Sequence, residues 1–433
     1  MNNRSEFLKF VIPSIIAFAL SGIYAIVDGF FVGNTIGDAG LSAINMAYPV
    51  VAVIQAVGTG IGMGGAVYYS INKAENKEKK AGEFAATSWW LLLISSIILT
   101  IIIYCFAKPI LTVMGMQKGI LSYGIEYIKI IAFGTVLQIL GTGLIPLMRN
   151  YGGSFMAMIA MVGGFVTNII FDFIFVWVQG YGMKGAALAT IMGQGVTALI
   201  AIIYAVYKKC FFVRVSMNHF LSILGSIVKV GLAPFGLALT PNISLVIINI
   251  FSVQYGGEKA IATYACIGYI ICIIYLILQG VGDGSQPLMS RYYGEKREED
   301  LKETIKMAYT LAIFLAVVGC VLMFVGRWNI GTLFGASNEV NINTGKIIPI
   351  FLISVPFVAI TRVSTAGFYA TEKSILSYIL TFIEPVLMLI LMLILPRLFG
   401  GQIMIWWSTV IARIVSAILA LYLTKKQMNK DLL

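Results

Sequence analysis

Charged residues are scarce in this chain. Of its 433 residues only 11% are Asp, Glu, Lys or Arg, and 59% are hydrophobic. Soluble domains carry roughly a quarter charged residues, so this composition excludes a soluble protein. A membrane-spanning helix needs about 20 mostly apolar residues, which leaves room for at most about a dozen spans and no sizeable domain outside the membrane. Any function must therefore lie within the bilayer.

The residues of most soluble-enzyme chemistry are also missing. The single histidine, His219, lies in a segment between apolar runs, so histidine metal sites and Ser-His or Cys-His nucleophiles lack their parts. No Walker A sequence and no C-x-x-C pair occurs. The cysteines are scattered over apolar stretches as small core residues; they are Cys105, Cys210, Cys266, Cys272 and Cys320. We therefore expect neither an enzyme nor a bound cofactor.

The apolar runs predict an all-α membrane protein with twelve transmembrane helices. The expected ranges are 8–33, 41–71, 84–107, 121–147, 155–178, 185–207, 222–253, 260–289, 305–326, 345–369, 374–397 and 402–424. Basic cytoplasmic loops explain the net charge of +11, so no nucleic-acid partner is expected. Most Lys and Arg residues fall in alternate connections, and this asymmetry places both termini in the cytoplasm.

An internal repeat runs through the chain at an offset of 220 residues. Gly60, Gly62, Gly64 and Ser154 correspond to Gly280, Gly282, Gly284 and Ser374. The repeat predicts two six-helix lobes, 1–207 and 222–433, joined by a cytoplasmic linker at 208–221. Because each lobe has an even number of spans, a pseudo-two-fold axis along the membrane normal relates the lobes across a cleft. The glycine run follows no strand, so close helix packing explains it better than dinucleotide binding.

Four oxygen-bearing side chains are predicted at one depth in the membrane. Asp28 and Asp172 lie about 8 to 9 Å from the outer ends of their helices, and Thr190 lies about 8 Å from the start of its own. Asn168 is one turn from Asp172 on the same face. Ionisable groups at membrane depth are costly and indicate function. The set suits a shared proton or a hard monovalent cation such as Na+, although Asp28 could instead be interfacial and Asp172 a partner of a backbone amide.

Other polar residues in the predicted helices have two interpretations each. Pro13 removes one backbone hydrogen bond from the helix of Asp28, and the weak point is either a hinge or a fixed bend. Tyr24, one turn from Asp28, either hydrogen-bonds the carboxylate or packs as an amphipathic side chain. Glu384 and Arg413, in the last two helices, either pair with each other or face a cavity.

Several stretches resemble the multidrug and toxic compound extrusion (MATE) transporters. They are IVDGFFVGNTIGDAGLSAINMAYPV at 26–50 and NIIFDFIFVWVQGYGMKGAALATIMGQG at 168–195. GLAPF at 231–235 and GVGDGSQPLMSRYYGEK at 280–296 resemble the second lobe of the bacterial multidrug-exporter branch. The resemblance covers essentially the whole chain. It implies a multi-pass antiporter of the bacterial plasma membrane that acts as a monomer in contact with lipid.

The resemblance also implies a substrate class and residue roles. Members export small, drug-like, amphipathic and often cationic organic compounds in exchange for H+ or Na+. The matching residues for the proton or cation are Asp28, Asn168, Asp172 and Thr190, with Pro13 as the proline that bends and Tyr24 as its neighbour. Adaptable side chains facing the cleft would contact the substrate, and the candidates are Met46, Tyr48 and Met161. Ile248 follows Asp28 by 220 residues, which puts a symmetric second ion site in doubt.

Two alternative functions remain open from the sequence. A lipid-linked precursor flippase would share the lobed architecture, but it would need a strongly cationic cleft for pyrophosphate, for which Arg149 and Arg413 are insufficient. A membrane-embedded enzyme could use an aspartate pair to hydrolyse peptides. The 220-residue duplication suits rocking lobes better than a single catalytic dyad.

Overall fold

The computed structural model describes residues 3–36, 38–116, 118–209, 213, 215–334 and 337–430, so Cys210 lies outside the described residues. Within these residues every regular element is helical, and twelve helical spans are long and apolar enough to cross a membrane. This confirms the predicted fold class. The elements are α1 Asn3–Ile36, α2 Asp38–Ala74, α3 Glu78–Val113, α4 Lys118–Asn150, α5 Ser154–Phe171, η1 Asp172–Val178, α6 Gly182–Tyr207, α7 Met217–Gly294, α8 Glu298–Gly326, α9 Ile330–Leu333, α10 Asn338–Ala370, α11 Ser374–Phe399 and α12 Gln402–Lys430.

The long element α7 departs from the predicted pattern because it contains two spans. At Gly257 the backbone takes φ 64° and ψ −162°, a conformation that glycine tolerates, and the spans on either side are His219–Gly257 and Lys259–Gly294. α7 begins at Met217, inside the predicted linker. His219 therefore lies in the first turn of a helix rather than in a connection.

Two short elements have no counterpart in the sequence prediction. η1 is a π-helix that follows α5 directly and completes the span Ser154–Val178. The four-residue α9 is held by Asn341, whose side-chain oxygen accepts a hydrogen bond from the Gly331 N–H at 2.9 Å. Hydrophobic periodicity cannot distinguish a π-turn from the α-helix around it, and π-turns inside helices often occur at functional sites.

The backbone repeats at the same offset of 220 residues as the sequence. α5 begins at Ser154 and α11 at Ser374. Two non-glycine residues in left-handed turns also correspond, since Asn76 has φ 60° and Lys296 has φ 58°. Left-handed non-glycine residues are uncommon, so the turn that follows α2 is repeated after α7 along with the helices.

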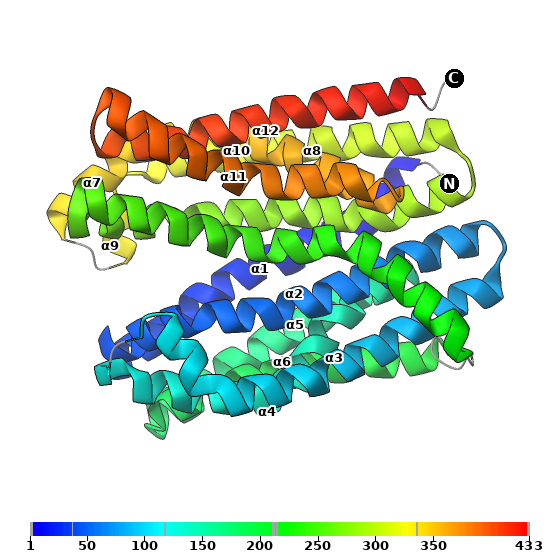
Figure 1. The fold of residues 1–433 in the computed structure, drawn as a ribbon, viewed down its shortest axis with the longest axis horizontal. Coiled ribbons are helices and arrows are strands. Elements are labelled where there is room, and N and C mark those ends of the chain that lie inside the picture. The colour runs from blue at the N-terminus through cyan, green and yellow to red at the C-terminus, as the bar shows by residue number, and fades with distance from the viewer. Residues whose placement is uncertain are drawn as a thin grey trace.

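The helices run roughly parallel to the longest axis of the molecule, and both termini lie at the same end (Figure 1). In that view α1 to α6 form one group and α8 to α12 form another, with α7 alongside the second group. α3 and α8 turn apolar side chains outwards at equivalent positions, since Ile101 is 58% exposed and Val321 is 56% exposed. Such side chains suit contact with lipid, where every backbone polar group is already satisfied within its helix.

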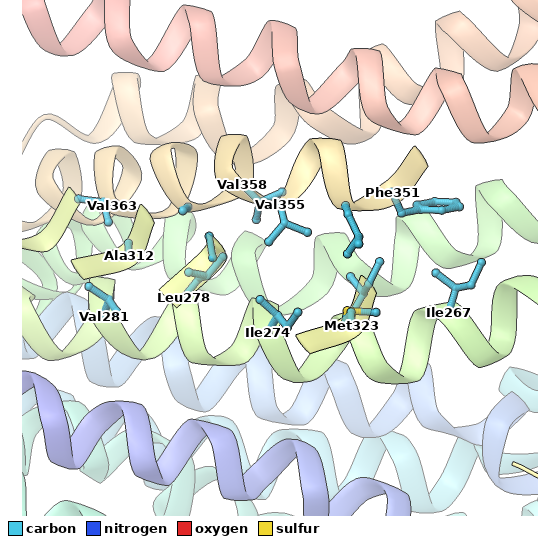
Figure 2. Packing of buried hydrophobic residues seen from close by; sticks show 14 of the residues in the cluster. Ile267, Ile274, Leu278, Val281, Ala312, Met323, Phe351, Val355, Val358 and Val363 are labelled. Atoms are coloured by element: carbon cyan, nitrogen blue, oxygen red, sulfur yellow. The ribbon is translucent and has the colours of Figure 1, made fainter. Parts of the chain in front are cut away.

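Each half of the chain has its own hydrophobic cluster. Figure 2 shows the second-half cluster, in which side chains of α7, α8 and α10 interdigitate. Ile267, Leu278 and Val355 are completely buried there. The corresponding cluster of the first half is built mainly from α2, α4 and α6. Two separately packed cores leave the contact between the halves to a different set of residues.

The glycines of α2 allow three neighbouring helices to approach closely, as predicted. A Cβ at Gly62 would collide with the carbonyl of Gly143 in α4. A Cβ at Gly64 would collide with the carbonyl of Ile227 in the first span of α7. On the other side of the repeat, a Cβ at Gly280 would come within 2.9 Å of the α1 backbone at Ile15. Small residues at helix crossings are typical of membrane proteins.

We expect Gly62→Ala to destabilise the first half. The added methyl group has backbone on the facing side, and overpacking of this kind costs about 1 to 3 kcal/mol. Thermal unfolding of the purified protein in detergent measures the effect. Gly225→Ala is the matched control, because no heavy atom lies within 4 Å of its added Cβ and alanine is the better helix former. Equal melting temperatures for the two variants would contradict the close crossing.

Candidate functional site

Asp28 and Asp172 lie together in the first half. α1 carries Asp28 and η1 begins at Asp172, and the two carboxyl groups interact with each other. Asp172 is 0% exposed, and among the described residues neither of its carboxyl oxygens has a hydrogen-bond partner. Oδ1 of Asp28 is also buried without a partner in the described part of the chain. Because buried polar groups nearly always find a partner, these oxygens indicate a site for a proton or cation.

Asn168 and Thr190 complete the predicted set from α5 and α6. Asn168 is buried one turn before Asp172, and neither its side-chain oxygen nor its nitrogen is hydrogen-bonded within the described residues. Thr190 is buried and donates to the carbonyl of Ala186 at 3.0 Å, which leaves its lone pairs free to accept. The buried oxygens of this set are the ligand type that hard cations prefer.

Tyr127 is a residue of this site that the sequence does not indicate. It lies on α4, is buried, and interacts with Asp28, Asp172 and the side chain of Thr190. Tyr24 also interacts with Asp28, and its ring stacks on Phe165 with centroids 5.2 Å apart. The hydrogen bonds of the described residues do not include one between Tyr24 and Asp28. Phenol groups thus surround the carboxyl pair from α1 and α4.

The predicted substrate-contact residues fall in different places. Tyr48 on α2 is 43% exposed, and it interacts with Asp28 in its own half and with Cys272 on α7. Since Cys272 is also exposed, both side chains line an accessible space between the halves. Met46 packs against the first hydrophobic cluster. Met161 contacts Arg149, whose guanidinium lies 3.6 Å from its sulfur.

Pro13 lies where α1 crosses the second span of α7. α1 continues as one helix through Pro13. The adjoining Ser14 and Ile15 pack against Gly280, and Val11 packs against Gly284. A missing backbone hydrogen bond at this crossing therefore falls at the contact between the halves rather than beside Asp28.

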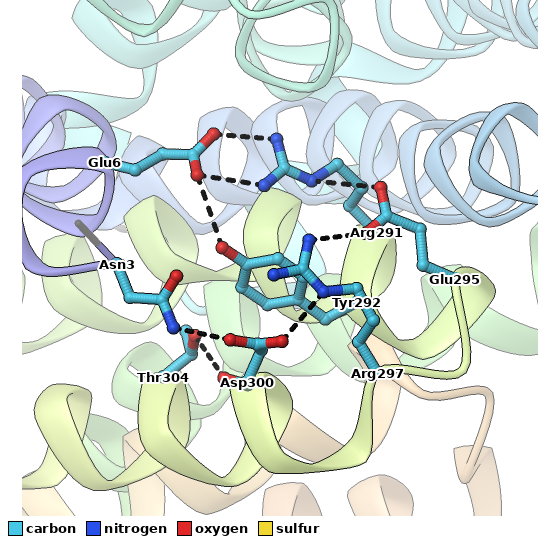
Figure 3. Close-up of polar contacts among 8 residues, drawn as sticks. All are labelled: Asn3, Glu6, Arg291, Tyr292, Glu295, Arg297, Asp300 and Thr304. Atoms are coloured by element: carbon cyan, nitrogen blue, oxygen red, sulfur yellow. Dashed lines mark hydrogen bonds and ion pairs between the residues drawn. The ribbon is translucent and has the colours of Figure 1, made fainter. Parts of the chain in front are cut away.

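The end of the bundle that carries both termini is closed by polar contacts between the halves. In Figure 3 the Arg291 guanidinium donates to both carboxylate oxygens of Glu6, at 2.7 and 3.0 Å. The Tyr292 hydroxyl donates to Glu6 at 3.3 Å, and the Asn3 amide donates to Asp300 at 2.5 Å. A bidentate arginine–carboxylate pair is both strong and geometrically specific. These contacts hold the start of α1 against α7 and α8.

A second set of contacts at the same end is buried. The Asn150 amide donates to Gln286 at 2.8 Å and accepts from Ser70 at 2.7 Å. Gln286 donates in turn to Ser290 at 2.8 Å. The set joins α2 and α4 to the second span of α7, and we call these four residues the inter-half seal.

We expect Gln286→Leu to weaken the seal and to shift the protein towards states in which this end is open. The change removes the side-chain bonds to Asn150 and Ser290, and each buried bond contributes about 0.5 to 1.5 kcal/mol. Spin labels at Asn76 and Lys296, in the two equivalent turns, should show a larger long-distance population. Gln138→Leu is the matched control, because the buried Gln138 amide nitrogen has no partner among the described residues. Identical distance distributions would refute the role of the seal.

The second half has no copy of the acidic site. The positions equivalent to Asp28, Asn168, Asp172 and Thr190 are Ile248, Met388, Met392 and Val410. All four are completely buried in apolar surroundings. Side chains without charge or carboxyl oxygens cannot hold a hard cation there.

The second half instead contains a buried ion pair. Arg413 donates to Glu384 at 3.0 Å and to the hydroxyl of Ser354 at 3.3 Å, and it lies over the Tyr275 ring at 5.0 Å. Of the two predicted possibilities, pairing is therefore confirmed. Gly164 and Gly193 occupy the equivalent positions in the first half, where a Cβ on either would collide with the other's carbonyl.

Comparison with known proteins agrees with this arrangement. The chain matches the MatE family over residues 13–174 and 238–394. The multidrug export protein MepA of Staphylococcus haemolyticus (strain JCSC1435) is 26% identical over 427 residues, covering 98% of this chain and 93% of the relative. The MepA protein of Staphylococcus saprophyticus subsp. saprophyticus is 26% identical over 432 residues, with 98% and 94% covered.

Solved structures share the fold throughout. An outward-facing multidrug resistance MATE transporter of the MOP superfamily has a TM-score of 0.92 at 22% identity, over 100% of this chain and 97% of its own. A MATE protein in a bent conformation has a TM-score of 0.87 at 22% identity, over 100% and 96%. The family match spans most of the chain and the fold agrees along its whole length, so this multi-pass membrane protein belongs to the MATE family of transporters and is not an enzyme.

Proposed function

We propose that this protein is a secondary antiporter that exports amphipathic, often cationic, drug-like organic compounds in exchange for H+ or Na+. The observation that carries the proposal is the pair of buried carboxyl groups, Asp28 and Asp172, whose oxygens lack donors among the described residues. Relatives over the full length are named multidrug export proteins. An acidic site of this kind favours a cation exporter over a flippase for lipid pyrophosphates.

The coupling ion binds between Asp28 and Asp172 in this proposal. Two adjacent carboxyls cannot both carry a charge at low cost, so one proton can be shared between them. Na+ would instead draw on the oxygens of Asn168 and Thr190 as further ligands. Either ion neutralises charge at the same place, and this common effect is what the mechanism requires.

Ion binding then drives alternation between two orientations. We propose that residues 1–207 and 222–433 move as two lobes joined by the linker 208–221, that Pro13 supplies the hinge, and that one chain suffices for transport. A ligand shifts such an equilibrium only by its different affinity for the two states. Loading the carboxyl pair changes the charge of the wall that a cationic substrate meets, so ion and substrate bind in turn. The end with the inter-half seal and both termini is then cytoplasmic.

Purified protein in liposomes tests the proposal directly. We expect concentrative transport of ethidium when an H+ or a Na+ gradient is imposed separately, with one of the two sufficient. Collapse of that gradient by an ionophore is expected to stop the transport. Transport that follows neither gradient, or an absence of ethidium movement under both, would refute an ion-coupled exporter.

A further inference from the structure

Arg362 stands apart from the other arginines within the spans. It lies on α10, about 12 Å from the end of the helix at 1.5 Å per residue. Arg413 has Glu384 and Ser354 as partners, and Arg149 lies against Met161 and the Phe18 ring. Arg362 has no hydrogen bond and no ion pair with any residue that the structure describes. A guanidinium with five donors is costly at membrane depth unless something accepts from it.

The acidic groups nearest to Arg362 are already engaged. Arg362 interacts electrostatically with Asp283 and Glu384. Oδ1 of Asp283 accepts from Tyr369 at 2.8 Å and from Gln279 at 2.7 Å. Oε1 of Glu384 accepts from Arg413. Both carboxylates therefore have closer donors than Arg362.

The guanidinium of Arg362 is also accessible. The residue is only half-buried, and its nitrogens are not among the buried atoms that lack partners. They therefore reach solvent. Arg362 interacts with Cys272, whose exposed side chain lines the space between the halves together with Tyr48.

The two walls of this space carry opposite charge. Asp28 interacts with Tyr48 on the first-half wall, and Arg362 lies beside Cys272 on the second-half wall. Tyr48 and Cys272 interact across the gap. A substrate lying between the walls therefore meets carboxyl groups on one side and an unpartnered guanidinium on the other.

We propose that Arg362 binds the carboxylate of zwitterionic amphiphiles, whose cationic group faces the wall of Asp28 and Asp172. The planar guanidinium matches a carboxylate in a two-pronged geometry, and the free donors explain why the side chain persists in the membrane without a protein partner. The proposal rests on the export function above and names its substrate class. A compound with both charges gains from both walls, whereas a simple cation gains from one.

Paired ligands that differ only in the carboxylate test this proposal. We choose norfloxacin, a zwitterion at neutral pH, and its methyl ester, which keeps the cationic amine and lacks the acid. Binding of each to the purified full chain in nanodiscs is measured for wild type, Arg362→Gln and Arg362→Lys. We expect Arg362→Gln to weaken norfloxacin binding about tenfold or more, the effect of losing a charge-assisted hydrogen bond. The ester should change less than about twofold, and Arg362→Lys should restore part of the acid's affinity.

The controls separate this inference from the export function. Arg327→Gln removes one positive charge from an arginine that lies over Phe324 and Trp328, away from the gap, and should leave the preference for the acid unchanged. Equal weakening of acid and ester by Arg362→Gln would overturn the carboxylate site. Unchanged acid binding would overturn it as well. Wild-type protein that transports ethidium but shows these results would retain its export function, whereas wild-type protein that moves neither compound nor ethidium would fail both proposals.

Discussion

Asp172→Asn is expected to abolish ion-driven export while leaving the fold intact. Asparagine has nearly the same shape, so the packing of η1 against α6 is retained, but it can neither take up a proton nor hold a cation by charge. The gradient then has no site through which to act. One charge moved through 100 mV supplies about 2.3 kcal/mol, roughly a fifty-fold concentration ratio, and this accumulation should be lost. The measurement is the steady-state ethidium ratio across liposomes under an imposed gradient.

Glu75→Gln provides the control for Asp172→Asn. It removes a carboxyl charge from the turn after α2, where Glu75 pairs with Lys77, and exposed pairs of this kind contribute little. Full coupling is expected in this variant. Passive equilibration of ethidium by Asp172→Asn, with the same melting temperature as wild type, would support a coupling role. Concentrative export at the wild-type level by a folded Asp172→Asn protein would eliminate the carboxyl pair from the mechanism.

Distances along the chain were enough to bring some site residues together in advance. Asp28 and Asp172 could be placed at one depth because both count from the outer end of an apolar run, and helix rise is constant. Tyr127 could not be found in this way. It reaches the site from α4, and which face of one helix meets another depends on crossing angle and rotation. Neither quantity follows from the apolar pattern of a helix that is hydrophobic on all sides.

The same reason explains the pairings that the sequence leaves wrong or open. Glu126 and Lys129 are one turn apart on α4 and could be expected to pair. In the structure Glu126 instead pairs with Lys184 at the start of α6, at 3.2 Å, and Lys129 lies over the Tyr104 ring. Neighbouring helices offered each side chain a partner that spacing along one helix could not reveal. Glycine positions were more informative, because a missing side chain constrains the neighbour whichever helix it is.

Glu384→Leu is expected to destabilise the second half strongly. Side chains of Glu384 and Arg413 are 22% and 7% exposed, so the substitution leaves a buried guanidinium without its carboxylate. Removing one partner of a buried ion pair costs about 3 to 5 kcal/mol. We expect a marked fall in melting temperature and in the yield of monodisperse protein, measured by fluorescence-detected size exclusion after heating.

The double variant Glu384→Leu/Arg413→Met distinguishes a structural pair from a functional one. Buried pairs replaced by apolar residues of similar volume are often as stable as the original, and the first half crosses its equivalent helices with Gly164 and Gly193 and no charge. Stability should therefore return close to wild type, so that the two single costs do not add. Export by the restored protein then reports the role of the pair: ethidium transport near wild type means that Glu384 and Arg413 hold α11 to α12 and no more. A double variant as unstable as Glu384→Leu would contradict the pairing energy itself.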